Sequence, residues 1–383
     1  MTGFFTSPRV AWGPGAVEQL SGLGARRALL IVDPVVAGAG GHRRVAEELV
    51  KSETVVEVVT AASDADHVSV VETLARRFTD FGPDWLVAVG GGRTLDGVKA
   101  ARLLYERPDL SLRSVSPVFE LPEPPRSRLV AIPTTSGSGS EASWAVDLVG
   151  SEGEPFELAH RSFVPDWAIV DATFSETLPN DLRRDGGVEA LGQAVEAYLS
   201  AWSNPFSDAL ALSVSRTMFE RLPHAIRWSD DPEAKEEAHY AATLAGLAAS
   251  NAQRGVAHAL ARALVAPTGL PYARLLGIAL PSVLDFDQPS ARDRLESLGS
   301  GVRRPDETSP VPLASRLRKF YELLRFPADL GAAGVPPERL TDDRARIVAR
   351  VLRTPGVLAN PRVPSAADVD ALLTSIATGP AAR

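Results

Sequence analysis

Short apolar segments of strand length alternate with helix-like segments along the first half of the chain. The strand-like segments are Ala28–Val32, Thr54–Val58, Trp85–Val89, Leu129–Ile132 and Trp167–Val170. Apolar positions spaced three and four apart predict a helix over His67–Phe81. Strands that alternate with helices are typical of a parallel sheet with crossover connections. We therefore expect a Rossmann-like α/β domain, which we place at residues 1–180.

The second half has a different pattern. Alanine- and leucine-rich segments with helical periodicity dominate after about Pro179, and strand patterns disappear. We therefore expect an all-helical domain over residues 181–383. Two proline-rich stretches, 116–128 and 302–317, are expected to be loops. With 383 residues the chain is long enough to give each domain its own core.

Two glycine- and hydroxyl-rich motifs directly follow strand-like segments. They are GGGRTLDGVKA at residues 90–100 and PTTSGSGSE at residues 133–141. Small residues in such places let backbone N–H groups and a helix N-terminus approach an anion. We expect Gly90, Gly91 and Gly92 to lie against the pyrophosphate of a dinucleotide, the alternative being plain tight turns.

An acidic residue follows the first strand-like segment. A carboxylate at Asp33 would accept hydrogen bonds from the adenosine ribose and repel a 2′-phosphate, which favours NAD over NADP. The alternative is a helix-capping or turn aspartate, since Asp33 precedes a proline. Arg43 and Arg44 lie nearby in the sequence and would admit a 2′-phosphate.

Composition narrows the class of protein. The formal net charge of −8 and the lack of a dense basic block argue against nucleic-acid or anionic-membrane partners. The chain has no cysteine, which excludes disulfides, thiolate catalysis and cysteine-bound metal. The N-terminus lacks a secretory pattern and no apolar run reaches spanning length, so we expect a cytoplasmic protein.

The two motifs resemble the GGGSxxDxxK and PTTxGTGSE signatures of the iron-containing (group III) alcohol dehydrogenases. Further landmarks follow in the same order: VAWGPGAVEQL from Val10, PDWAIVD from Pro165, EAYLSAWSNPFSDALAL from Glu196 and GVAHALA from Gly255. The resemblance implies a Rossmann-like domain followed by a helical domain. It also implies NAD(P)-linked interconversion of alcohols and carbonyls, and a homodimer.

The resemblance extends the set of cofactor-binding residues. Asp96, Lys99, Thr134, Thr135 and Ser138 match positions that contact the cofactor in the family. Arg93 stands where the family usually has serine, and it either clamps a phosphate or points to solvent. Near Pro155 the family commonly carries a cofactor-contacting lysine, and the segment EPFELAH has none.

The family's metal site is altered in this chain. The resemblance implies one divalent metal held by an aspartate and three histidines, and the matching positions are Glu189, Gln193, His258 and Tyr272. Zinc or ferrous iron needs at least three good nitrogen or oxygen donors, and an amide and a neutral phenol are poor ones. We expect no tightly bound metal, the alternative being a Tyr272 phenolate ligand.

Hydride transfer without a metal still needs a group that moves the alcohol proton. We expect His258, Tyr272 and Arg262 to be catalytic, with Tyr272 transferring the proton. Arg262, at the place of a further active-site histidine of the family, either lowers the pKa of Tyr272 or holds a substrate carboxylate. Arg254 and Arg274 flank this segment, either as part of a carboxylate receptor or as solvated arginines.

These residues predict an NAD-dependent oxidoreductase acting on a small-molecule or peptide substrate that bears a carboxylate. A special case is oxidative decarboxylation of a β-hydroxy acid, such as the C-terminal threonine of a ribosomal peptide. Two other classes remain as alternatives. One is a lyase or cyclase similar to dehydroquinate synthase, which relies on the metal. The other is a non-catalytic NAD-binding protein, against which the intact nucleotide motifs count.

Overall fold

The computed structural model describes residues 5–61, 67–115, 125–150, 155–227, 231–303 and 309–379. The chain divides into two compact units, Met1–Leu178 and Pro179–Arg383. Within the described ranges, no helix is both long and apolar enough to cross a membrane.

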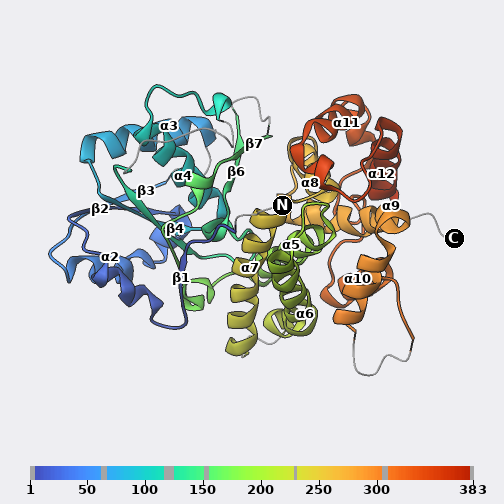
Figure 1. The fold of residues 1–383 in the computed structure, drawn as a ribbon, viewed down its shortest axis with the longest axis horizontal. Coiled ribbons are helices and arrows are strands. Elements are labelled where there is room, and N and C mark those ends of the chain that lie inside the picture. Colours follow the sequence, from blue (N-terminus) through green and yellow to red (C-terminus); the bar gives the residue numbers. More distant parts are fainter. Residues whose placement is uncertain are drawn as a thin grey trace. The chain divides into compact units, whose positions relative to one another are not determined.

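A parallel sheet of six strands forms the centre of the first unit, in the order β1-β8-β5-β4-β2-β3 (Figure 1). The strands are β1 (Arg9–Trp12), β2 (Arg27–Val32), β3 (Val55–Thr60), β4 (Trp85–Gly90), β5 (Arg128–Pro133) and β8 (Trp167–Val170). All five predicted strands are present, and the predicted Rossmann-like parallel sheet is confirmed. The four-residue β1 at the sheet edge was not predicted, because its sequence RVAW is too short to show a pattern.

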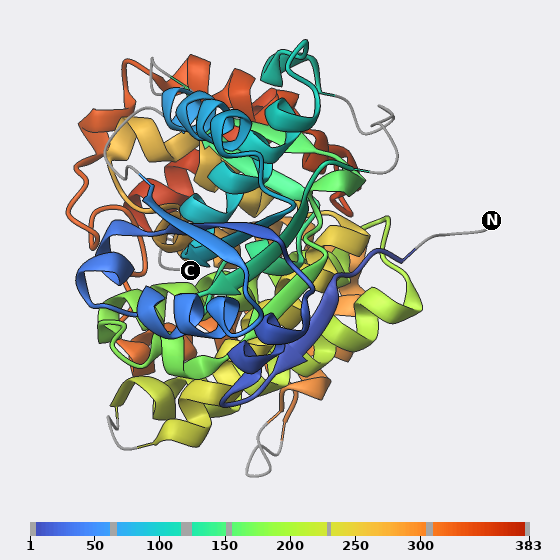
Figure 2. The same ribbon diagram turned by 90° about the vertical axis from the view of Figure 1, so that its left-hand side faces the viewer.

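Helices cover both faces of this sheet (Figures 1 and 2). On one face, Leu29 and Leu86 pack against α3 (His67–Phe81) and α4 (Gly92–Glu106). On the other, Leu30 and Val87 pack against α2 (His42–Val50) and the 3-10 helix η1 (Ala16–Gly22). Successive strand residues point to opposite faces, so a strand buried on both sides is apolar at nearly every position. The uninterrupted apolar sequences of β2 and β4 therefore made these strands predictable.

The rest of the first unit consists of short elements. They are α1 (Pro34–Gly38), the antiparallel ribbon β6 (Ala145–Val149) and β7 (Pro155–Ala159), and the 3-10 helices η2 (Leu112–Ser114), η3 (Ser140–Ala142), η4 (Arg161–Phe163) and η5 (Ala172–Ser175). The ribbon was not predicted, because polar side chains interrupt the apolar pattern of both of its strands.

The described residues of the second unit form helices and no strand, as predicted. The helices are α5 (Asn180–Leu199), α6 (Pro205–Arg227), α7 (Pro232–Ala252), α8 (Val256–Thr268), α9 (Tyr272–Gly301), α10 (Leu313–Leu324), α11 (Arg344–Arg353) and α12 (Ala366–Thr378), with η6 (Pro337–Leu340) and η7 (Pro355–Ala359) between them. One continuous apolar core joins them, and α5 lies at its centre with almost every residue buried. Although α5 is buried on all sides, it carries polar side chains among its small and apolar residues, namely Arg183, Asp185, Glu189, Gln193 and Glu196.

The two predicted loops fall partly outside the described residues, which exclude 116–124 and 304–308. The second loop is also shorter than predicted, because α10 already begins at Leu313. Leu313, Leu317 and Phe320 are buried along one face of this helix, and their burial stabilises it directly after the prolines.

Candidate active site

Three neighbouring strands of the sheet end at the same edge, each in a segment predicted to bind a nucleotide. The backbone N–H of Asp33, after β2, donates to the carbonyl of Val89 at 2.9 Å. The N–H of Thr134, after β5, donates to the carbonyl of Gly90 at 3.1 Å. The chain direction across the sheet reverses between β2 and β4. Ligands of open parallel sheets bind outside the carboxyl ends of strands at such a switch point.

Close packing explains the glycines between β4 and α4. A Cβ on Gly90 would lie 2.7 Å from the Cβ of Thr94, and a Cβ on Gly92 would lie 2.7 Å from Oγ of Ser138. Gly91 is the N-cap of α4 in an extended conformation and offers no capping side chain. The first N–H groups of α4 therefore stay open to a ligand. This cradle fits the pyrophosphate of NAD or NADP.

The Asp33 carboxylate is held through both of its oxygens. Oδ1 accepts the N–H of Val35 at 2.9 Å and thereby caps α1, so the predicted alternative of a capping aspartate is confirmed. Oδ2 accepts the hydroxyl of Thr94 at 3.0 Å. A carboxylate has about four acceptor positions, so these two bonds leave room for a ribose diol. The contact with the ribose remains a prediction. Arg44 forms an ion pair with Asp171 at 3.3 Å and is thus already engaged.

Asp96 and Lys99 form a buried pair on α4. Nζ of Lys99 lies 3.1 Å from Asp96, 3.1 Å from Oγ of Ser140 and 2.9 Å from the carbonyl of Ala145, which uses its three donors. Asp96 also accepts the N–H of Asp147 at 2.9 Å. Burial raises the pKa of Asp96 and lowers that of Lys99, while their mutual attraction opposes both shifts. The pair fastens α4 to the β6 segment, and its direct contact with a cofactor stays a prediction.

The other predicted cofactor residues lie on the rim of the cradle. Arg93 is exposed, and its Nε donates to Nε2 of His67 at 2.6 Å. Thr134 is buried, whereas Thr135 and Ser138 are half-buried beside the glycines. The structure thus brings both glycine-rich motifs together, and the individual cofactor contacts of these residues remain predictions.

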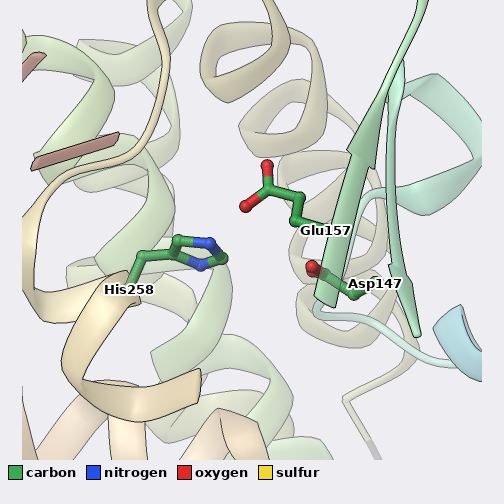
Figure 3. A group of neighbouring side chains, drawn as sticks. All are labelled: Asp147, Glu157 and His258. Carbon is green, nitrogen blue, oxygen red and sulfur yellow. The ribbon is translucent and has the colours of Figure 1, made fainter. Parts of the chain in front are cut away.

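Two carboxylates face each other on the β6–β7 ribbon (Figure 3). Asp147 and Glu157 are cross-strand partners, so their side chains project from the same face of the ribbon. An oxygen of each lies within 4.8 Å of one of the other. Glu157 belongs to the segment EPFELAH, which lacks the family's lysine. The ribbon is therefore acidic at this place.

In the second unit, α5 carries Glu189 and Gln193 one turn apart. Both side chains are buried, and Nε2 of Gln193 lies 3.5 Å from Oε1 of Glu189. Residues four apart share a face of a helix, so these two predicted positions face the same way.

His258 and Tyr272 come together from two helices of the second unit. Nδ1 of His258, on α8, lies 2.7 Å from the hydroxyl of Tyr272, the first residue of α9 (His258 is drawn in Figure 3). The rings meet edge to face with centroids 5.6 Å apart. Arg262 is buried one turn after His258 on the same face of α8. The structure thus joins a phenol and an imidazole in one hydrogen bond, close to a cation.

The four side chains at the predicted ligand positions are a poor ligand set for the divalent metal that the family resemblance implies. Glu189 and His258 are good donors, but Gln193 offers only an amide and Tyr272 a phenol. The Nδ1–hydroxyl hydrogen bond also engages one imidazole nitrogen with the phenol. Two good donors are fewer than a tight zinc or iron site needs.

A buried polar cluster holds the start of α8. Oε1 of Glu196, one turn after Gln193 on α5, accepts the backbone N–H of His258 at 3.1 Å. Oδ1 of Asn360 accepts the N–H of Val256 at 3.1 Å, and its Nδ2 donates to Asp287 at 2.6 Å. Burial raises the pKa of Glu196 to about 7 and that of Asp287 to about 7. The helix that carries His258 is thereby fixed to α5.

The flanking arginines are used inside the second unit. Nε and Nη2 of Arg274 donate to Oδ2 of Asp185 at 2.9 and 2.6 Å, and Arg184 holds the other oxygen of that carboxylate at 2.9 Å. Arg254 is buried and its charge acts on Glu196. Arg274 is therefore a structural ion-pair partner.

Fold and site together define a Rossmann-like unit with a glycine-rich cradle, followed by a helical unit with a hydrogen-bonded His258–Tyr272 pair. Family models identify the class further. The model described as "Iron-containing alcohol dehydrogenase" matches residues 7–172, and the one described as "Fe-containing alcohol dehydrogenase family, C-terminal" matches residues 184–377. The chain belongs to the iron-containing alcohol dehydrogenase family and is an NAD(P)-linked oxidoreductase of the alcohol dehydrogenase type.

Comparison with individual proteins of this family is consistent with this assignment. The chain is 29% identical over 370 residues to the NADPH-dependent butanol dehydrogenase of Clostridium saccharobutylicum, covering 94% of each chain. It is 31% identical over 335 residues to the alcohol dehydrogenase of Thermococcus barophilus, covering 85% of this chain and 86% of the relative. The solved iron-containing alcohol dehydrogenase of Thermococcus thioreducens superimposes with a TM-score of 0.89 at 27% identity, covering 98% of this chain and all of that one.

Two residues of these sites, Thr94 and Glu196, were not predicted from the sequence. Thr94 touches both Gly90 and Asp33, yet nothing distinguished it from a surface threonine in a first helical turn. Glu196 lies three residues after Gln193, and the spacing of Glu189, Gln193 and Glu196 along one helical face was the available signal.

Proposed function

We propose that this protein is an NAD-linked dehydrogenase or reductase that works without a metal, with Tyr272 as its proton-transfer group. The hydrogen bond of 2.7 Å between Tyr272 and His258 carries this proposal. With His258 in the tautomer protonated on Nε2, its Nδ1 would accept the phenol proton of Tyr272. Both residues stand where the resemblance implies metal ligands.

Tyr272 and His258 can together take up the proton that the alcohol releases when it is oxidised. NAD+ supplies the hydride acceptor when it is bound. In the direction of oxidation, the alcohol proton passes to the Tyr272 oxygen while the phenol proton passes to Nδ1 of His258. His258 must then begin as the tautomer protonated on Nε2, and it ends as imidazolium. In reduction the same two protons move in the opposite direction.

Arg262 supports an anionic substrate. It is a buried cation on the face of α8 that carries His258, and a guanidinium binds a carboxylate through two parallel hydrogen bonds. We propose a hydroxy acid or oxo acid, either a small molecule or a peptide end. Oxidation of a β-hydroxy acid at this site would give a β-keto acid, whose loss of CO2 needs no metal. A homodimer, which the family resemblance implied, remains part of this proposal and is tested by light scattering.

The substrate class is tested with chelator-treated protein and NAD+. Candidate substrates are 2-hydroxy acids, 3-hydroxy acids, peptides ending in threonine and the matching neutral alcohols, and both NADH and CO2 are measured. NADH formation with carboxylate-bearing substrates alone supports the proposal, and CO2 release selects the β-hydroxy acid case. Activity that returns only with added iron or zinc contradicts it. NADH binding without turnover of any substrate indicates a non-catalytic NAD-binding protein.

The proton-transfer role is tested by Tyr272→Phe. Loss of a general acid–base group lowers kcat by about 100-fold to 10,000-fold, while NADH affinity should not change. Tyr240→Phe is the matched control, because Tyr240 makes its hydrogen bond to Glu236 on the surface of α7. Unchanged kcat in Tyr272→Phe would remove Tyr272 from the mechanism.

A further inference from the structure

We infer that Thr94 is a specificity-determining positioning residue, which orients the Asp33 carboxylate and thereby sets the preference for NAD over NADP. The inference rests on the proposed NAD-linked function, because it concerns the same nucleotide site. Thr94 lies inside the motif of residues 90–100 but is not among the residues predicted to bind the cofactor.

The Thr94 hydroxyl is directed at Asp33 rather than at the backbone of its own helix. Thr94 is the third residue of α4 and only 8% exposed. A threonine hydroxyl in a helix commonly bonds the carbonyl four residues earlier, which here belongs to Gly90. That carbonyl already accepts the N–H of Thr134 at 3.1 Å. The Thr94 hydroxyl donates instead to Oδ2 of Asp33 at 3.0 Å.

The Thr94 side chain occupies the space that is open beside Gly90. A Cβ on Gly90 would lie 2.7 Å from Cβ and 2.9 Å from Cγ2 and Oγ1 of Thr94, so the threonine fills the space that the glycine leaves. A β-branched side chain in a helix has few rotamers to choose from. Threonine in a helix has about two χ1 rotamers, so fixing its hydroxyl on Asp33 costs little side-chain entropy.

The Asp33 carboxylate accepts one hydrogen bond on each of its two oxygens, and together these bonds define the orientation of its plane. Val35 N–H binds Oδ1 at 2.9 Å and Thr94 binds Oδ2 at 3.0 Å, which fixes the plane in which the remaining acceptor positions lie. A ribose diol needs two acceptors in a fixed arrangement, whereas a 2′-phosphate is repelled by the same charge. Loss of the Thr94 contact frees the carboxylate to rotate, which weakens NADH and spares NADPH.

The experiment measures binding of NADH and NADPH to the full chain by calorimetry, without substrate. Thr94→Val keeps the branched shape and removes the hydroxyl, whereas Thr94→Ser keeps the hydroxyl. We expect Thr94→Val to weaken NADH about three- to tenfold, as for a lost hydrogen bond to a charged group partly replaced by water, with NADPH changed less than about twofold. Thr94→Ser should retain the preference of the wild-type protein. Asp33→Ala should weaken NADH at least as much and relax discrimination against NADPH.

A double variant separates positioning from direct contact. In an Asp33→Ala background, Thr94→Val should have little further effect, since the two residues act as one unit. Equal weakening of NADH and NADPH by Thr94→Val would overturn the inference, because it would mean that Thr94 contacts the phosphates shared by both cofactors. An unchanged ratio would overturn it as well. If the wild-type protein binds neither cofactor, the proposed function itself fails, which is a different result.

Discussion

The two units of the chain differ in how far they keep the chemistry of their family. In the first unit, the strand ends, three glycines and Asp33 form a cradle whose parts contact one another. In the second unit, the ligand positions carry a carboxylate, an amide, an imidazole and a phenol, and the last two share a hydrogen bond. The helices around these positions are buried and continuous.

The helices that carry these four positions are held together by contacts of the chain itself. The core of the second unit and the cluster of Glu196, Asn360 and Asp287 hold α5 and α8 together through the chain's own atoms. In the first unit, by contrast, a Cβ on any of the three glycines of the cradle would lie 2.7–3.2 Å from a neighbouring side chain. The nucleotide unit is thus under tight steric constraint, whereas the helical unit carries different donors at the positions that match the family's metal ligands.

The largest expected effect comes from restoring the family's ligands. The variant Glu189→Asp, Gln193→His, Tyr272→His should bind zinc at least about a hundredfold more tightly than the wild-type protein. Even groups that only support a metal ligand are each worth about 10- to 100-fold in affinity. Calorimetry with zinc measures the gain. Adding His258→Ala to this variant should remove it, and equal affinities of variant and wild type would show that these positions do not form a site.

The second largest effect is expected for Gly92→Ala, which tests the steric fit of the glycine-rich cradle. Gly92→Ala places a Cβ 2.7 Å from Oγ of Ser138, and such overpacking costs about 1–3 kcal/mol. We expect at least about a tenfold loss of NADH affinity, measured by fluorescence titration.

Gly97→Ala is the matched control on the same helix. A Cβ there would meet no described heavy atom within 4 Å, so NADH binding should not change. The free energy of unfolding should rise by about 0.5–1 kcal/mol, as for glycine to alanine inside a helix. Equal losses of NADH affinity in both variants would refute the steric account of the cradle.

The buried carboxyls of the helical unit predict how stability depends on pH. Burial raises the pKa of Glu196 from 4.5 to about 7 and that of Asp287 from 3.8 to about 7. At a pH between the unfolded and the folded pKa, these carboxyls stay protonated in the folded protein and are ionised in the unfolded chain. The free energy of unfolding should therefore fall as pH rises from about 4 to 7, by on the order of 3 kcal/mol per carboxyl.

Isosteric neutral variants check this dependence. Glu196→Gln with Asp287→Asn cannot titrate at these positions, and the amide oxygens can still accept the hydrogen bonds. Urea unfolding at several pH values should show a flatter profile for the double variant than for the wild-type protein. Parallel profiles would mean that the two carboxyls are ionised in the folded state.

The fold was largely predictable because its strands are buried on both faces. β2, β4 and β5 read as unbroken apolar runs, which leaves little choice of element. The β6–β7 ribbon mixes polar and apolar residues, and β1 has only four residues, so neither stands out from a loop.

The sites were predictable where chemistry follows from spacing along one element, as for Glu189 and Gln193 on α5. Contacts between distant segments were not. The engagement of Arg274 by Asp185 joins residues 89 positions apart, and the Thr94–Asp33 bond spans 61 positions. Such pairs depend on the packing of whole helices and strands, which no local pattern encodes.

We propose that the nucleotide site is functional and that the hydrogen-bonded pair of Tyr272 and His258 acts in place of the family's metal. This proposal is tested most directly by incubating the purified protein with NADH and with ferrous iron or zinc, then measuring both bound components after desalting. The account predicts stoichiometric NADH and metal far below stoichiometry. A tightly held, stoichiometric metal whose removal by a chelator abolishes turnover would contradict it.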